Sequence, residues 1–380
     1  MTKKKKVVVG LSGGVDSAVS AYLLKEQGYE VIGLFMRNWD SAANNDILGN
    51  PNDPNDLCPQ EQDYQDALNI ANHLNIPLHR HDFIEEYWNY VFSYFIDEYK
   101  KGRTPNPDIL CNKYVKFAGF QEVADDLGAD YYAYGHYARR KIEDGEHFLL
   151  RGKDKNKDQS YFLSHLSQKQ LAKSLFPVGE LSKKDVRKIA KEQAIPTFNK
   201  KDSTGICFIG ERDFKEFLKN YIFTKPGDIE TTDGQVIARH DGLMYYTIGQ
   251  RKGLEIGGLK DYPNAPWFVV GKDIDRNVLI VGQGKNHPWL FANRVIVEDV
   301  HWIGHDRFEG QYECSAKFRY RQADQQVLIK WLDDKTIEVI ARHPVRAVTP
   351  GQASVFYEGQ VCLGGGTIKE SYQNQKKLMY

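Results

Sequence analysis

Short apolar runs alternate with amphipathic segments over the first third of the chain. Runs rich in β-branched residues predict strands at residues 7–11, 30–36, 77–83 and 129–134. Apolar positions three and four residues apart predict helices at 17–27, 61–74, 84–100 and 109–127. This alternation is typical of a parallel sheet with crossover helices, so a Rossmann-like α/β domain is expected.

The pattern becomes shorter and more glycine-rich further along the chain. A hairpin is predicted at 140–151, around Asp144 and Gly145, and helices are predicted at 168–174, 182–193 and 212–221. Strands are then predicted at 235–239, 243–248, 267–272, 278–282, 312–321, 326–332, 336–341 and 354–363. The last four indicate a small antiparallel barrel. We therefore expect an α/β domain with a helical extension at 1–210, a mainly-β domain at 211–284 and a C-terminal β-barrel at 285–380.

Composition limits the partners of the chain. Its 380 residues exceed one ordinary core, and 41% are apolar. Lys plus Arg and Asp plus Glu are equal at 51 each, so any binding to RNA must come from a local patch. No apolar run reaches the roughly 18 residues of a membrane helix, and no signal peptide is recognised. A cytoplasmic protein without a membrane partner is expected.

Two further features come from residue spacing. Residues 38–59 are rich in Asn, Asp, Pro and Gly and are too long for a routine connection, which predicts a mobile loop or lid. The five cysteines are scattered without a C-x-x-C pair, so neither a disulfide scaffold nor a tightly bound metal site is expected.

A phosphate loop is the strongest local signal. It follows the first predicted strand, precedes the first predicted helix and consists of Gly10, Leu11, Ser12, Gly13, Gly14, Val15, Asp16 and Ser17. Adjacent glycines allow main-chain N–H groups to approach an anion, and the helix N-terminus adds partial positive charge. The P-loop lysine and the G-x-G-x-x-G pattern are both absent, which disfavours ordinary kinases, GTPases and dehydrogenases. The alternative is a plain glycine-rich turn.

Two cysteines lie in segments that suit chemistry. Asp108 is predicted to cap a helix with Cys111 in its first turn, where the helix end lowers a thiol pKa although the Asp108 carboxylate opposes this. Asp108 is itself a candidate proton donor or acceptor. Cys207 lies in a strand-like stretch between glycines. Either cysteine, read alone, is equally compatible with a buried structural role, which is also the interpretation for Cys58, Cys314 and Cys362.

The phosphate loop resembles that of the ATP pyrophosphatases, which split ATP into AMP and pyrophosphate while adenylating a carbonyl oxygen. With the segments 104–112 and 202–210, the chain resembles the tRNA-specific 2-thiouridylases over nearly its whole length. Further matching segments are 134–137, 157–163, 246–253, 317–321 and 350–353.

The resemblance implies a role for each matching residue. ATP, with Mg²⁺, would be bound by Gly10 to Ser17 together with Met36 and Gly135. Cys207 would carry a persulfide, Cys111 would be the nucleophile and Asp108 the acid or base. The target base would contact Asn106, Pro107 and Asp108. The residues implied to contact tRNA are His136, Lys157, Asp158, Gln159, Arg319, Tyr320 and Gln352.

The resemblance also implies partners: glutamate, glutamine and lysine tRNAs, and a cysteine desulfurase or sulfur-relay protein as sulfur donor. Read without it, His136 suits a structural histidine, and 317–321 suits a strand with a solvated basic face. Two other functions stay open: an amide-forming ATP pyrophosphatase, and a non-catalytic tRNA-binding or sulfur-carrier protein.

Overall fold

The computed structural model describes residues 4–41, 43–46, 59–202, 214–259, 262–304 and 310–379. The predicted lid at 38–59 lies largely outside these ranges, as do Cys58 and Cys207. Two compact units are present. The first comprises Met1–Ser93, Pro107–Asn220 and Gln360–Cys362, and the second Tyr94–Asn106, Tyr221–Gly359 and Leu363–Tyr380.

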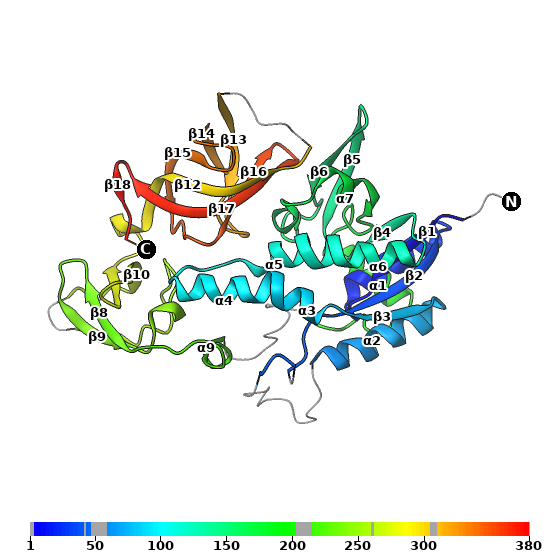
Figure 1. The fold of residues 1–380 in the computed structure, drawn as a ribbon, viewed down its shortest axis with the longest axis horizontal. Coiled ribbons are helices and arrows are strands. Elements are labelled where there is room, and N and C mark those ends of the chain that lie inside the picture. Colours follow the sequence, from blue (N-terminus) through cyan, green and yellow to red (C-terminus); the bar gives the residue numbers. More distant parts are fainter. Residues whose placement is uncertain are drawn as a thin grey trace. The chain divides into compact units, whose positions relative to one another are not determined.

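A five-stranded parallel sheet forms the centre of the first unit, in the order β3-β2-β1-β4-β7 (Figure 1). Its strands are β1 (Lys6–Gly10), β2 (Glu30–Arg37), β3 (Leu78–Asp82), β4 (Tyr131–Ala133) and β7 (Ser174–Leu175). The three valines of β1 are completely buried because helices cover a parallel sheet on both faces. The expected Rossmann-like sheet is confirmed.

Helices around this sheet enclose its core. They are α1 (Val15–Glu26), α2 (Pro59–Leu74), α3 (Ile84–Tyr87), η1 (Trp88–Phe92), α5 (Pro107–Leu110), η2 (Cys111–Gly119), α6 (Phe120–Asp126), η3 (Ser160–Leu163), α7 (Gln168–Lys173), α8 (Lys183–Glu192) and α9 (Phe214–Lys219). Valine and alanine positions of α1, α2 and α8 share one apolar cluster with β1 and β2. Elements η1 and η2 are π-helical, a local winding that periodicity does not distinguish from an α-helix.

A β-hairpin completes the first unit, as predicted. Strands β5 (Ala138–Glu143) and β6 (Glu146–Arg151) meet at Asp144 and Gly145, both with positive φ, as a type I′ turn requires. Val361 and Cys362, near the C-terminal end of the chain, pair with β6 and belong to this unit.

The second unit begins with the last part of α4 (Ser93–Lys100) and contains a four-stranded sheet ordered β10-β11-β8-β9. These strands are β8 (Gly227–Thr231), β9 (Val236–His240), β10 (Trp267–Asp273) and β11 (Val278–Gln283). The predicted strand at 243–248 is wrong, because the short 3₁₀ helix η4 (Leu243–Tyr245) occupies its start. Its apolar residues instead pack under the sheet from an irregular segment.

An antiparallel barrel forms the rest of this unit, confirming the predicted barrel. Its strands follow η5 (Pro288–Leu290) and are β12 (Phe291–Trp302), β13 (Gln311–Lys317), β14 (Gln325–Trp331), β15 (Ile337–Arg346), β16 (Ala353–Glu358) and β17 (Val361–Gln373), with β18 (Lys376–Lys377) attached to β17. Pairing of β12 with β17 closes it. The single strand predicted at 354–363 is wrong, because Gly359, with positive φ, turns the chain there.

Candidate functional site

The predicted phosphate loop joins the C-terminal end of β1 to the start of α1. Ser17 stabilises it, since its Oγ accepts from the Ser12 main-chain N–H (3.2 Å) and donates to the Gly14 carbonyl (3.1 Å). Gly14 precedes the helix, and no side chain of the described residues caps its start. The first N–H groups of α1 are therefore available to an anion.

Two glycines allow other segments to approach this loop closely. Gly13 has φ +75°, and a Cβ there would lie 2.4 Å from the Asp63 carbonyl. A Cβ on Gly135 would lie 2.8 Å from the Ser17 main-chain nitrogen. The structure therefore places Gly135 beside the loop, as its predicted ATP-binding role requires. Met36 lies near the C-terminal end of β2, which neighbours β1.

Charged groups converge on Asp16. Its carboxylate accepts from the Tyr137 hydroxyl (2.8 Å), and Lys183 Nζ lies 2.7 and 2.8 Å from its two oxygens. Lys183 also lies 2.8 Å from Asp202, which Lys157 and Arg187 contact as well. Desolvation opposes ionisation of Asp202, but Lys157 and Lys183 outweigh it and lower its pKa to about 2. Asp202 is therefore a fixed negative charge at neutral pH.

The segment that carries Asp108 and Cys111 differs from the prediction at its start. Helix α5 begins at Pro107, because proline fits the first helical position. Asp108 thus lies inside the first turn and does not cap the helix, and Cys111 follows α5 as the first residue of η2. The predicted effect of the helix end on the Cys111 thiol is therefore wrong in its geometry.

Burial separates the two groups. Cys111 is 4% exposed, whereas the Asp108 side chain reaches solvent. Even so, desolvation by surrounding atoms raises the pKa of Asp108, with Lys116 partly opposing the shift. A carboxyl of this kind is suited to exchange a proton nearer neutrality than an ordinary aspartate. Because Cys207 lies outside the described residues, its distance from Cys111 is not tested.

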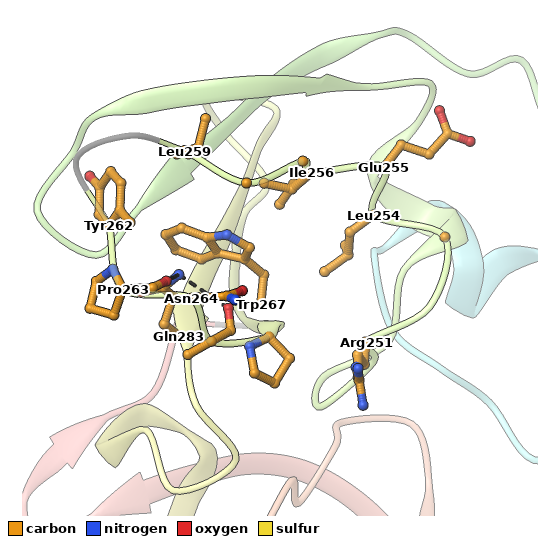
Figure 2. Close-up of a pocket in the computed structure, with 15 residues that line it drawn as sticks. Arg251, Leu254, Glu255, Ile256, Leu259, Tyr262, Pro263, Asn264, Trp267 and Gln283 are labelled. Carbon is orange, nitrogen blue, oxygen red and sulfur yellow. Dashed lines mark hydrogen bonds between the residues drawn. The ribbon is translucent and has the colours of Figure 1, made fainter.

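A separate cavity of about 460 Å³ lies in the second unit. Figure 2 shows the Trp267 indole between Leu254 and Tyr262, with the Gln283 amide donating to the Pro263 and Ala265 carbonyls. None of the predicted site residues lines it.

No cluster of His, Cys, Asp or Glu suited to a metal ion is found in the described ranges. Among the same residues, every helix is too short or too polar to cross a membrane.

Sequence comparisons match the chain along most of its length. Residues 5–211 match the family described as "tRNA methyl transferase HUP domain", 215–283 the "tRNA methyl transferase PRC-barrel domain" and 292–368 the "Aminomethyltransferase beta-barrel domain". The chain is 54% identical to the tRNA-specific 2-thiouridylase MnmA of Geobacillus thermodenitrificans and 52% identical to that of Bacillus thuringiensis (strain Al Hakam), each time over 99% of this chain and 97% of the relative. The chain belongs to the tRNA-specific 2-thiouridylase family.

Similarity to solved structures is much weaker. NMN synthetase from Francisella tularensis matches with a TM-score of 0.33 and 20% identity, covering 57% of this chain and 72% of the other. Similarity this low supports no further inference.

Four residues with predicted tRNA contacts in this thiouridylase-family chain lie in the first unit, and three of them make internal contacts. Lys157 pairs with Asp202 (2.6 Å), Asp158 is buried and accepts from two main-chain N–H groups, and Gln159 accepts from the Tyr137 N–H (2.9 Å). His136 is also buried, and desolvation lowers its pKa well below the usual value, so its ring is neutral at pH 7.

The other three lie in the second unit, outside regular strands. Arg319 and Tyr320 follow the end of β13, so the strand expected at 317–321 is wrong. Arg319 donates to the Ile248 carbonyl (2.8 Å) and Thr349 Oγ1 (2.6 Å), and Gln352 donates to the Thr104 carbonyl (2.8 Å). Their contact with tRNA stays a prediction.

Lys183 is the functional candidate that the sequence interpretation missed. The sequence showed the segment from Ser182 only as a helix start, which the structure confirms as a capping box between Ser182 and Asp185. Since Lys183 is 167 residues from Asp16, no local motif links the two.

Proposed function

We propose that the protein is a tRNA-uridine 2-sulfurtransferase that uses ATP to convert the wobble uridine of tRNA into 2-thiouridine. The observation that carries this proposal is 54% identity to a curated 2-thiouridylase over 99% of the chain. The geometry of the phosphate loop and the position of Cys111 after α5 support the same reaction.

ATP would bind at the C-terminal edge of the parallel sheet. Main-chain N–H groups of Gly10 to Ser17 face the phosphates in this proposal, with Met36 and Gly135 near the rest of the nucleotide. Lys183, held by Asp16, supplies the positive charge that a P-loop lysine supplies elsewhere. Asp16 also offers hard oxygen ligands suited to Mg²⁺, which would neutralise phosphate charge when bound with ATP.

Adenylation is the first chemical step of the proposal. The C2 oxygen of uracil attacks the α-phosphorus, the bond to the bridging oxygen breaks, and pyrophosphate leaves. Charge then increases on the leaving group, where the helix N-terminus and Lys183 stabilise it. The base must first leave the anticodon stack, and Asn106, Pro107 and Asp108 are its proposed contacts.

Sulfur transfer is the second step. The terminal sulfur of a Cys207 persulfide attacks C2 directly, or Cys111 releases it as hydrosulfide, and AMP leaves. In both routes Cys111 attacks the inner sulfur of Cys207 and a disulfide between the two cysteines remains, to be reduced from outside. The two Cα atoms must therefore approach within about 7 Å in at least one state. Asp108 takes up or donates the accompanying proton.

The proposed partners follow from these steps. They are glutamate, glutamine and lysine tRNAs as substrates and a cysteine desulfurase or sulfur-relay protein as donor, all in the cytoplasm.

The test measures pyrophosphate release and 2-thiouridine formation with unmodified glutamate tRNA, ATP, Mg²⁺ and a persulfide donor. Release that requires tRNA, with thiolation lost in both Cys111→Ser and Cys207→Ser, is the expected result. Cys314→Ser is the matched control, because Cys314 is buried in β13 and has no proposed role.

The same experiment separates the two other functions. An amide-forming ATP pyrophosphatase would release pyrophosphate without tRNA and would keep full activity in both serine variants. A non-catalytic tRNA-binding or sulfur-carrier protein would release no pyrophosphate under any condition. Either outcome would refute the proposal.

A further inference from the structure

The main chain just before the proposed base contacts belongs to the second unit. Helix α4 ends at Lys100, and residues 101–106 continue from it to Asn106, which a peptide bond joins to Pro107. These residues have no regular secondary structure in which their main-chain groups could pair. Their conformation therefore depends on contacts with other parts of the unit.

Thr104 is held on three sides. Its N–H donates to the Pro350 carbonyl (3.0 Å), and its carbonyl accepts from Gln352 Nε2 (2.8 Å). Its Oγ1 lies 3.3 Å from Thr247 Oγ1. Gln352 Nε2 also lies 3.3 Å from the Pro105 carbonyl, so this amide holds the two peptide groups immediately before Asn106.

Main chain packs directly on main chain at this point. Gly351 has φ +88°, and a Cβ there would lie 3.0 Å from the nitrogen, carbon and oxygen of Thr104. The Gly351 N–H donates to the Ile368 carbonyl (2.9 Å), and the Ile368 N–H donates to the Gln352 carbonyl (2.8 Å). The turn that holds Thr104 is thus fixed on strand β17 of the barrel.

Arg319 joins the two sides of this arrangement. Its guanidinium bonds the Ile248 carbonyl, next to Thr247, and Thr349 Oγ1, next to Pro350. Before Thr104, Lys272 is 4% exposed, and its Nζ donates to the Gly102 carbonyl (2.7 Å). Residues from three matching sequence segments, 246–253, 317–321 and 350–353, thus meet around the chain that enters the base-contacting residues.

We propose that Thr247, Arg319, Thr349, Pro350, Gly351 and Gln352 form a Thr104 clamp that positions Asn106 for the target base. The inference rests on the proposed function and deepens it. In this role Gln352 is a positioning residue that sets the rate of the chemistry, and the direct tRNA contact inferred from sequence is not its function. A displacement of about 1 Å at reacting groups can lower a rate about a hundredfold, so the clamp acts without touching the substrate.

The test compares Gln352→Glu and Gln352→Met with Gln326→Glu. Glutamate keeps the shape of Gln352 but replaces the donating N–H₂ with an oxygen that faces two carbonyls. Methionine removes the donor without adding charge. Gln326 is exposed on β14 of the same barrel and makes no contact with the clamp, so Gln326→Glu is a matched control for charge.

Three quantities are measured for each variant: the Kd for tRNA, the single-turnover rate of 2-thiouridine formation at saturating tRNA, and hydrogen exchange of peptides covering 101–110 without ligands. For Gln352→Glu, we expect a rate at least about tenfold lower with a Kd within about twofold of the native value. Exchange of 101–110 should rise by about threefold or more because the clamp no longer protects it. Gln326→Glu should match the native protein.

A Kd raised about tenfold with an unchanged saturating rate would show that Gln352 contacts tRNA and would overturn the clamp. Unchanged exchange would also overturn it. If Gln352→Glu does not fold, Gln352→Met is judged by the same criteria. If the native protein forms no 2-thiouridine, the proposed function fails, and the exchange result alone decides whether the clamp exists.

Discussion

Asp108 illustrates a conflict between stability and function at the scale of one residue. Because desolvation raises its pKa, ionisation of this carboxyl opposes folding. The stability it gives when protonated is complete below the unfolded-state pKa and is lost as the pH rises through the folded-state pKa. Asp108→Asn should therefore raise Tm near pH 8 and have little effect near pH 4, while thiolation falls.

Thermal unfolding at the two pH values, together with the pH profile of single-turnover thiolation, checks this prediction. The variant should lose the part of the rate profile that Asp108 titration causes. An equal change of Tm at both pH values would mean that the carboxyl affects stability through packing and not through its charge.

Lys183 allows a sharper test of the nucleotide site. Lys183→Met keeps the length of the side chain but removes its charge, so the KM for ATP in pyrophosphate release should rise by about tenfold or more. The adjacent Lys184 is exposed, and Lys184→Met is the matched control. An unchanged KM in Lys183→Met would mean that Lys183 only holds Asp16 and Asp202 in place.

Residues near one another in sequence were predictable, and partners from distant segments were not. The spacing of Gly10 to Ser17 after an apolar strand indicated a phosphate loop. The ion pair between Asp16 and Lys183 joins α1 to α8, and no periodicity relates these two helices. The same holds for Gln352 and Thr104, since sequence alone suggested only that Gln352 is polar and available.

At the scale of elements, the approach of Gly135 to the start of α1 is the contact least able to change. In Gly135→Ala, the new methyl group would meet the main chain of Asp16 and Ser17, so the helix start must move. We expect weaker ATP binding and a loss of about 1–3 kcal/mol in the free energy of unfolding.

Urea unfolding and ATP titration measure these two effects. Gly257→Ala is the control, because no atom lies within 4 Å of the position a Cβ would occupy there. A Gly135→Ala protein as stable as the control would contradict the close approach.

Element type was predictable where burial has a clear period. The parallel strands and the barrel strands follow from apolar runs and alternation. Residues 243–248 were misread, because their apolar side chains pack from an irregular segment and give the composition of a strand without its pairing. The start of α5 was misplaced because Asp108 suits both a cap and a first turn.

For the whole molecule, charge balance sets the character of tRNA binding. With 51 basic and 51 acidic residues, few phosphate contacts are expected. The Kd for tRNA should therefore rise less than about a hundredfold between 50 and 200 mM salt, whereas six to ten contacts would cost about 10³–10⁵. Binding measured across this range checks the expectation, and a steeper dependence would indicate a basic patch that the pairing of Lys157 with Asp202 does not reveal.

The class and order of the domains could be predicted, but the composition of the two units could not. Residues 94–106 and 360–362 each join the unit that most of their sequence neighbours do not. Such exchanges depend on tertiary pairing, for which a continuous sequence contains no local signal. The proposed boundaries at 210 and 284 stay predictions.

The pairing of Val361 and Cys362 with β6 has a consequence for biosynthesis. Because the ribosome makes the chain from its N-terminus, the first unit lacks this strand until residue 362 has emerged. At about 5–20 residues per second, the roughly 210 residues after β6 leave its edge exposed for at least about ten seconds. The nascent N-terminal unit is therefore a candidate for chaperone protection, and its completion is one of the last events of translation.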